Sequence, residues 1–366
     1  MVITQREQEI IAILKKNPML SQQEIADLLQ ITRSSVAVHI ANLLKKGVIK
    51  GKGYVIDERD YVSVIGGANM DIVGYPDGAL RKKDSNPGQV KLSVGGVGRN
   101  IAENLARLDT SVKMFSCVGE DFHGEKIISS GIDCGMDMSH VKRVKDYSTG
   151  TYLALLDEDH DMEVAISAMD IFKTLDEEYL RDNQLIISKS RAIVFDTNLE
   201  EKVFEYGVNL FKDNDLYLDT VSHTKAMRVK DIIGLFHTIK PNKLEAEALS
   251  GIEIKTKDDL ARSAEYFHEK GVKNIFITWG EKGVYYSNQK DQGFLQSKKV
   301  IPKNATGAGD AFQAALVYAD LEKMKIRDQA AFSMAASLVA MDSYDTINKE
   351  MSVAKIKAKI KTMEVI

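Results

Sequence analysis

The sequence contains little cysteine: only Cys117 and Cys134 occur among its 366 residues. Two cysteines cannot build a disulfide framework, and the first 30 residues lack the apolar core of an export signal. No apolar run approaches the roughly 20 residues that a helix needs to cross a membrane. These absences exclude a disulfide-rich secreted protein and a membrane protein. We therefore expect a cytoplasmic protein with reduced thiols and no membrane partner.

Histidine is also scarce, and its seven residues show no metal-ligand spacing, so a histidine metal centre is not indicated. Net charge is only −4, but it is unevenly distributed, with +4 on residues 1–56 and −8 on the remainder. The length suggests more than one domain. We expect a basic first domain at 1–56, a charged linker at 57–60 and a second domain at 61–366.

The first domain has the pattern of three short helices followed by a hairpin at 48–56. Ser21 and Glu24 form a capping-box signature for the second helix, and Thr32 starts the third. This order resembles a winged helix-turn-helix, whose recognition helix enters the major groove of duplex DNA. The alternative is a protein-interaction module with a solvated basic face. The predicted DNA contacts are Thr32, Arg33, Ser34, Ser35, Val38, His39 and Asn42, with Lys45, Lys46, Lys50 and Lys52 near phosphates.

The rest of the chain alternates short apolar strands with helical patterns. The predicted strands include 61–65, 112–118, 192–195, 216–219, 236–239 and 274–278. This alternation is typical of a parallel α/β sheet with helices on its faces. The acidic run at 157–161 resembles a metal cluster, but its position between two strand patterns favours the turn of a hairpin.

The segment 304–310 (NATGAGD) is followed at once by an apolar helical run. Its glycines allow a sharp turn, and the helix that follows offers free N–H groups and a positive dipole end to an anion. Asp310 would repel a resting phosphate, so we interpret it as a base that takes a proton from an attacking hydroxyl. This combination indicates a kinase of small alcohols. The alternative is a glycine-rich helix cap with an ordinary first-turn aspartate.

Three further segments combine glycine with polar residues, namely 66–71 (GGANMD), 95–100 (GGVGRN) and 278–283 (TWGEKG). Asn242 and Glu245 also lie together at the start of a predicted helix. The polar groups that follow strands are expected at the carboxyl edge of the sheet, where α/β folds bind ligands. A Rossmann site is not indicated, because no third glycine follows at the required spacing and no strong strand pattern precedes the glycines at 95–98.

Together these segments resemble the ribokinase-like family of carbohydrate and nucleoside kinases over about residues 61–350. The resemblance rests on five motifs in order: Gly67-x-Asn69-x-Asp71, Gly95-Gly96-x-Gly98-x-Asn100, Asn242-x-x-Glu245, Thr278-x-Gly280-x-x-Gly283 and Gly307-Ala308-Gly309-Asp310. Within this family the chain is similar to pseudouridine kinases, notably at 84–88 (DSNPG) and 241–247. The resemblance implies a three-layer α/β/α sheet with a small β lid at about 74–94 and 141–166. Because such lids often pair two subunits, it also implies a homodimer.

The resemblance assigns a role to each motif. Asp310 would accept the proton of the 5′-hydroxyl of pseudouridine, while the N–H groups from Gly307 to Asp310, including those of Ala308 and Gly309, hold the charge that develops on the transferred phosphate. Asp71 and Asn100 would bind the ribose hydroxyls. The full set of implied substrate residues is Asn69, Asp71, Ser85, Asn86, Gly95, Gly96 and Asn100. ATP would contact Asn242, Glu245, Thr278, Gly280 and Gly283, with Asn242 and Glu245 organising Mg²⁺ and its waters.

One residue departs from the family pattern. Many members have aspartate at the position of Asn304, where it helps to hold a monovalent cation. Asn304 and Thr306 would form that site here, but an amide oxygen carries no charge, so the resemblance leaves potassium activation open. Three functions fit the sequence: a pseudouridine kinase with a fused DNA-binding domain, a kinase of another nucleoside or sugar, and a transcription regulator that uses the kinase fold as a ligand sensor. The intact Gly-Ala-Gly-Asp and Asn-x-x-Glu motifs favour an active enzyme.

Overall fold

The computed structural model describes residues 3–17, 20–46, 48–49, 60–159, 161–296 and 302–363. The chain divides into two compact units, Met1–Glu58 and Arg59–Ile366. This division falls inside the linker predicted at 57–60, of which only residue 60 is described. Each unit is treated below by itself.

The first unit contains three helices, α1 (Gln5–Lys16), α2 (Gln22–Leu29) and α3 (Arg33–Lys45). Ser21 caps α2 through a capping box with Glu24, and Thr32 caps α3, as the sequence predicts. The side chains that close the small core are Ile10, Ile25, Ala26, Val36, Ile40 and Leu43. Most of the hairpin predicted for 48–56 lies outside the described residues.

The second unit is built on a sheet of eight strands in the order β14-β13-β12-β11-β10-β9-β1-β4. Neighbouring strands run parallel from β4 to β12, while β13 and β14 form an antiparallel edge. The strands are β1 (Tyr61–Ile65), β4 (Ser111–Phe115), β9 (Ala192–Asp196), β10 (Leu216–Asp219), β11 (Thr238–Ile239), β12 (Asn274–Thr278), β13 (Val284–Ser287) and β14 (Gln292–Leu295). The parallel α/β sheet predicted from the sequence is confirmed, although the pattern did not predict β14.

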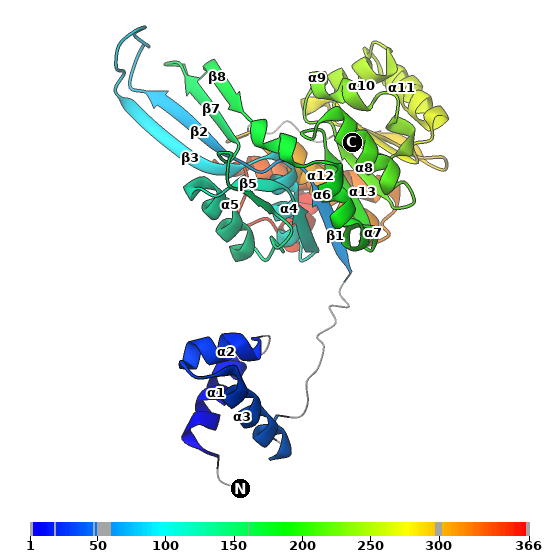
Figure 1. Ribbon diagram of the computed structural model, residues 1–366. Helices are drawn as coiled ribbons and strands as arrows, with labels where there is room; N and C mark the ends of the chain where they lie inside the picture. Colours follow the sequence, from blue (N-terminus) through cyan, green and yellow to red (C-terminus); the bar gives the residue numbers. More distant parts are fainter. Residues whose placement is uncertain are drawn as a thin grey trace. The chain divides into compact units, whose positions relative to one another are not determined.

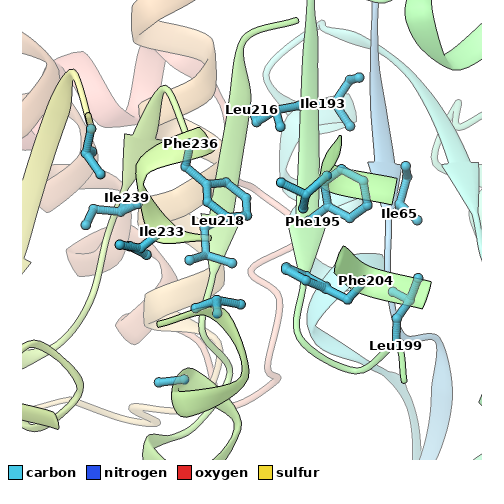
Figure 2. Packing of buried hydrophobic residues seen from close by; sticks show 14 of the residues in the cluster. Ile65, Ile193, Phe195, Leu199, Phe204, Leu216, Leu218, Ile233, Phe236 and Ile239 are labelled. Atoms are coloured by element: carbon cyan, nitrogen blue, oxygen red, sulfur yellow. The ribbon is translucent and has the colours of Figure 1, made fainter. Parts of the chain in front are cut away.

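Both faces of this sheet are buried. Successive residues of a strand point to opposite sides, and every residue of the central strands β9 and β10 is buried. Figure 2 shows Ile193 and Phe195 of β9 beside Leu216 and Leu218 of β10, within the core of one face. Ala192 and Val194 belong to the core of the other face. The first face packs against α6 (Glu177–Asp182), α7 (Gln184–Ser188), α8 (Glu201–Leu210), α9 (His223–Ala226), α10 (Lys243–Ser250) and α11 (Lys257–Lys270). The second packs against α4 (Val97–Arg107), α5 (Phe122–Asp133), α12 (Ala308–Leu321), α13 (Ile326–Met341) and α14 (Val353–Thr362).

A second sheet of four strands forms the lid, in the order β3-β2-β7-β8. Its strands are β2 (Asn69–Pro76), β3 (Gly88–Gly95), β7 (Thr151–Leu156) and β8 (Met162–Ala168), and Figure 1 shows them extending away from the main sheet. The lid therefore begins at residue 69 rather than 74. Its second half begins at 151 rather than 141, because β6 (Lys142–Val144) pairs instead with β5 (Cys117–Gly119). Strand β7 ends at Leu156 and β8 begins at Met162, and between them Asp157 accepts hydrogen bonds from the N–H groups of Asp159 and Asp161.

Both cysteines are free thiols, and Cys117 is buried. Among the described helices, none combines the length and the apolar character needed to cross a membrane.

Candidate active site

The polar groups of the second unit gather at the carboxyl end of the parallel strands. Strand β1 lies between β4 and β9, so the chain order reverses beside it, which is where open α/β sheets bind ligands. Strands β9 and β10 end at Asp196 and Asp219, and β11 is followed directly by Lys240. All three side chains are at least nine-tenths buried. None of the three belongs to a motif to which the sequence assigned a role.

Asp196 fixes the two glycine-rich segments that follow β1 and precede α4. Its Oδ2 accepts hydrogen bonds from the N–H groups of Gly67 (2.8 Å) and Gly98 (2.7 Å). A Cβ on Gly66 would overlap this carboxylate, so the position requires glycine. Burial raises the pKa of Asp196, and the backbone hydrogen bond from Gly67 opposes that effect. Asp196 therefore acts as a positioning residue for both segments.

Asp310 lies in the first turn of α12, close to the N-terminus of α4. Asn100 donates from Nδ2 to Asp310 Oδ2 at 2.9 Å. Oδ1 of Asn100 is buried and has no hydrogen-bond partner among the described residues, so it is available to accept a substrate hydroxyl. Burial and the neighbouring Asp219 raise the pKa of Asp310 to about 7. A carboxyl group with this pKa can accept a proton near neutral pH.

The predicted anion site lies at the N-terminus of the same helix. Gly307 caps α12 with φ 82°, and a Cβ there would overlap the carbonyl oxygen of Thr346, so the turn requires glycine. The Ala308 N–H donates to Ala305 O at 3.3 Å. This bond corrects the prediction that the Ala308 N–H is free. The first turn of a helix leaves N–H groups without intrahelical acceptors, and those of Gly309 and Asp310 are the better candidates for a phosphate.

The lid strands bring Asn69, Asp71 and Gly95 together at the same edge. Asn69 donates from Nδ2 to Asp71 Oδ1 at 2.6 Å, and burial raises the pKa of Asp71. Asn69 pairs with Gly95 across β2 and β3, and a Cβ on Gly95 would overlap the Asp71 carboxylate. Gly96 has φ 100° and lies against the Gly67 carbonyl, so these segments form one cradle.

Ser85 and Asn86 are not brought to this cradle. They lie in the connection between β2 and β3, at the end of the hairpin opposite Asn69 and Gly95. The paired strands separate the two ends by roughly 23 Å, at about 3.3 Å per residue. Both residues are exposed, and the Asn86 amide is bonded to the backbone of Arg81. We therefore withdraw them as contacts to substrate in the same subunit.

The Asn242-x-x-Glu245 motif forms the capping box of α10. Asn242 Oδ1 accepts from the Glu245 N–H, and Glu245 Oε2 accepts from the Asn242 N–H at 2.8 Å and from Thr220 Oγ1 at 2.6 Å. The described residues contain no cluster of three acidic, histidine or cysteine side chains that could hold a metal ion. Glu245 is buried and its Oε2 already accepts two hydrogen bonds, so its fit to Mg²⁺ is through water, with the ion held mainly by nucleotide phosphates. Glu245 would orient those waters, as the resemblance implies.

The predicted nucleotide residues lie beside this motif. Thr278 and Asn242 pair in an isolated parallel β-bridge, and the Thr278 N–H donates to Pro241 O at 3.0 Å. Gly280 (φ 55°) and Gly283 (φ 124°) shape the turn into β13, and a Cβ on Gly283 would overlap the Leu295 carbonyl. Gly283 is thus explained by folding alone, whereas Thr278 and Gly280 remain predictions for contact with ATP.

Asn304 and Thr306 form a loop that is closed by hydrogen bonds of the Asn304 amide. Its Oδ1 accepts from the Thr306 N–H at 2.9 Å, and its Nδ2 donates to Tyr344 O at 3.2 Å. The amide therefore holds together the loop to which the resemblance assigns a cation site.

The first unit presents α3 as a candidate nucleic-acid interface. Thr32, Arg33, Ser34, Val38, Asn42 and Lys45 are exposed, whereas Ser35 and His39 are partly buried. Lys46 has a different role from the one predicted, because its ammonium pairs with Glu7 at 2.6 Å. Glu7 is 1% exposed, and the hydrogen bond from Lys46 lowers the pKa of Glu7 to about 2. Lys46 therefore joins α3 to α1, and Lys45 is the better candidate for a phosphate contact. Lys50 and Lys52 lie outside the described residues.

Comparison with known families assigns both parts of the chain. The pfkB family of carbohydrate kinases matches residues 59–352, and a winged helix-turn-helix DNA-binding family matches residues 3–50. The crystal structure of a protein described as a sugar kinase from Clostridium perfringens has a TM-score of 0.78 and 35% identity. It covers 85% of this chain and 98% of its own.

Two relatives from Escherichia coli K12 resemble the chain over most of their own length. The uncharacterized sugar kinase YeiI is 37% identical over 95% of this chain and 96% of that protein. Pseudouridine kinase is 36% identical over 84% of this chain and 98% of that protein. The YeiI alignment is too long to be confined to the kinase unit. The chain belongs to the pfkB family of carbohydrate kinases, with a winged helix-turn-helix domain at its N-terminus.

Proposed function

We propose that the chain is an ATP-dependent kinase that phosphorylates the 5′-hydroxyl of pseudouridine. The observation that carries the chemistry is the Asn100–Asp310 pair at the N-terminus of α12. Asp310 accepts the hydroxyl proton as the hydroxyl oxygen bonds to the γ-phosphorus of ATP, and the bond to the bridging oxygen of ADP breaks. The N–H groups of the first turn of α12 donate to the oxygens of the transferred group. Mg²⁺ would neutralise the phosphates, with Glu245 orienting its waters.

The substrate is inferred from the relative named pseudouridine kinase, which the chain matches along nearly all of that protein's length. In the structure, Asn69, Asp71 and Asn100 supply polar groups at one edge, as a ribose ring with several hydroxyls requires. The reaction uses ATP and the chain keeps two free thiols, and both features suit the reducing cytoplasm that we propose as its location.

A panel of pseudouridine, uridine, ribose and adenosine, assayed with ATP and Mg²⁺, tests the substrate. We expect pseudouridine to have the highest kcat/KM. A higher value for ribose or adenosine would overturn this assignment and favour the second candidate, a kinase of another nucleoside or sugar. A protein that binds pseudouridine but transfers no phosphate would instead support a ligand-sensing regulator. The buried, raised-pKa Asp310 argues against that third function, because a sensor has no need of a base.

We also propose that the first unit binds duplex DNA through α3. The winged helix-turn-helix match and the exposed polar face of α3 support this role. Fusion to the kinase suggests that the protein regulates transcription. The nucleoside is the natural signal to test, by measuring affinity for its own promoter region with and without pseudouridine at fixed salt.

A homodimer through the lid is the remaining proposal. Leu92, Ile72, Leu153 and Ile166 lie opposite one another across the four strands, and the next row is Val90, Gly74, Leu155 and Val164. Paired residues share a face, so these two rows form one continuous apolar surface, which we call the outer lid face. Val90, Val164 and Ile166 are 64%, 51% and 60% exposed. A second copy of the same face is an occupant of matching chemistry.

The adjacent residues Val90 and Gln89 provide a matched test of the dimer. Both are exposed on β3, but only Val90 lies on the outer lid face. Val90→Lys should convert a dimer into a monomer in analytical ultracentrifugation, because two charges would be buried at the interface. Gln89→Lys should leave it dimeric. A wild-type protein that is monomeric at tens of micromolar, or a Val90→Lys variant that stays dimeric, would contradict the proposal.

A further inference from the structure

Lys240 is a buried lysine that the proposed mechanism does not yet use. It follows β11 directly, is 8% exposed, and its Nζ lies 3.4 Å from Asp219 Oδ2. Lysine is almost never this buried unless it is paired, because its charge loses hydration. Its position among the strand ends therefore requires an explanation.

The charges of three carboxylates from three elements act on this ammonium, and Asp219 is its ion-pair partner. Burial lowers the pKa of Lys240. The charges of Asp219, Glu245 and Asp310 outweigh that effect and hold this pKa above its ordinary value. The side chain is therefore a full cation at neutral pH. One cation among three carboxylates leaves an excess of negative charge at the place where a polyphosphate must enter.

The ammonium also faces the N-terminus of α12. A Cβ built on Gly309 would have one described heavy atom within 4 Å outside its immediate neighbours, and that atom is Lys240 Nζ at 3.6 Å. The space beside the first turn is thus open, and a lysine ammonium borders it. The ammonium is therefore a neighbour of the first turn of α12, whose N–H groups lack intrahelical acceptors, and a phosphoryl group requires donors of both kinds.

We propose that Lys240 is a catalytic residue whose ammonium contacts the phosphoryl group during transfer. This inference rests on the kinase activity of the proposed function. The bond from the hydroxyl oxygen to phosphorus forms, the bond to the bridging oxygen of ADP breaks, and the hydroxyl proton passes to Asp310. Lys240 keeps its proton throughout and moves from Asp219 toward the equatorial oxygens. The competing explanation is that Lys240 serves only as the counterion of Asp219.

Two substitutions and one control separate these explanations. Lys240→Met should lower kcat by about 10²–10³-fold, the typical effect of losing one transition-state donor. The Kd for the nucleoside should change less than about twofold, and Lys240→Arg should recover at least about tenfold of the lost kcat. Lys113→Met is the control, because Lys113 is also a partly buried lysine paired with a carboxylate, Asp137, but lies on β4. It should lose stability and keep its kcat.

Binding of a planar phosphoryl mimic supplies the readout that a structural role would not change. Affinity for ADP, Mg²⁺ and aluminium fluoride with the nucleoside should fall in Lys240→Met in parallel with kcat, while affinity for ADP alone changes little. Active sites are counted by nucleoside titration, so that partial unfolding cannot imitate a catalytic loss. Retention of more than about a tenth of wild-type kcat per active site, or unchanged affinity for the mimic, would overturn the proposal. If the panel shows another substrate, kcat and mimic affinity of Lys240→Met relative to wild type are measured with that substrate. The pseudouridine assignment can then fail while the role of Lys240 holds, and the reverse is also possible.

Discussion

At the scale of single residues, the site places an aspartate among other acids. Asp310 lies near Asp219 and Asp196, which raise its pKa together with burial, while Asn100 and Lys240 oppose them. A base is most effective when its pKa lies near the working pH, since it is then both ionised and basic enough to take a proton. The neighbouring carboxylates thus help to bring the pKa of Asp310 near neutral pH, and the charge of Lys240 limits how far that pKa rises.

The first prediction concerns the base itself. Asp310→Asn should reduce kcat by about 10²–10⁴-fold, because the amide cannot accept the hydroxyl proton. Nucleoside affinity, measured by calorimetry, should stay within a few-fold, since Asn100 keeps its free Oδ1. A variant with more than about a tenth of wild-type kcat would remove Asp310 from this role.

The raised pKa also predicts two pH effects. Activity requires ionised Asp310, so kcat/KM should fall as pH drops through about 7. Stability has the opposite sign: between the ordinary aspartate pKa, about 3.9, and about 7, the folded state holds a proton that the unfolded chain has released. Wild-type stability should therefore decrease as pH rises through this window. The melting temperature of Asp310→Asn relative to wild type should be lowest near pH 4 and highest above pH 7, and a constant difference would contradict the assignment.

At the scale of elements, the Asn304 side chain closes the loop that precedes α12. The Asn304 amide bonds to Thr306 and Tyr344 and so ties the loop together without a charge. We predict that replacing potassium by choline changes wild-type kcat by less than about twofold. Asn304→Asp would remove the donor to Tyr344 and add a charge, so it should introduce potassium dependence. Potassium activation of the wild type by tenfold would show that the backbone alone holds the ion.

Local chemistry explains which elements the sequence could predict. The caps at Ser21 and Thr32 depend on neighbours three residues away, so their signals are contained in short stretches of sequence. Lys46 was predicted to lie near DNA phosphates, but it pairs with Glu7. Glu7 lies on another helix, so no local sequence pattern predicts this ion pair.

Contacts distant in sequence also explain the other omissions. Asp196 and Asp219 end apolar strands, which is a usable signal, but their partners depend on the tertiary fold. Ser85 and Asn86 were placed in the site by resemblance, whereas the strand register puts them at the far end of the hairpin.

At the scale of the molecule, the two units carry separable chemistry. All the catalytic groups described here belong to Arg59–Ile366, and the relative named pseudouridine kinase matches only 84% of the chain. We predict that deleting residues 1–58 leaves kcat and KM within about twofold and abolishes DNA binding in a mobility-shift assay at low salt. Loss of kinase activity in a folded truncation would mean that the first unit completes the active site. Absence of any shift by the full chain, with or without pseudouridine, would reject the DNA-binding role.

The pairing of β1 with β4 and β9 has a consequence for how the chain is made. The contacts of α1 to α3 are local, so the first unit can fold soon after it leaves the ribosome. Strand β1 cannot gain its neighbour β9 until the intervening lid has been synthesised, a delay on the order of ten seconds at typical rates of translation. During that interval the apolar strand β1 has no β9 to pair with, although the first unit has already folded. Nascent chains should therefore acquire the DNA-binding unit before the enzyme, and arrested translation would release a binder without a kinase.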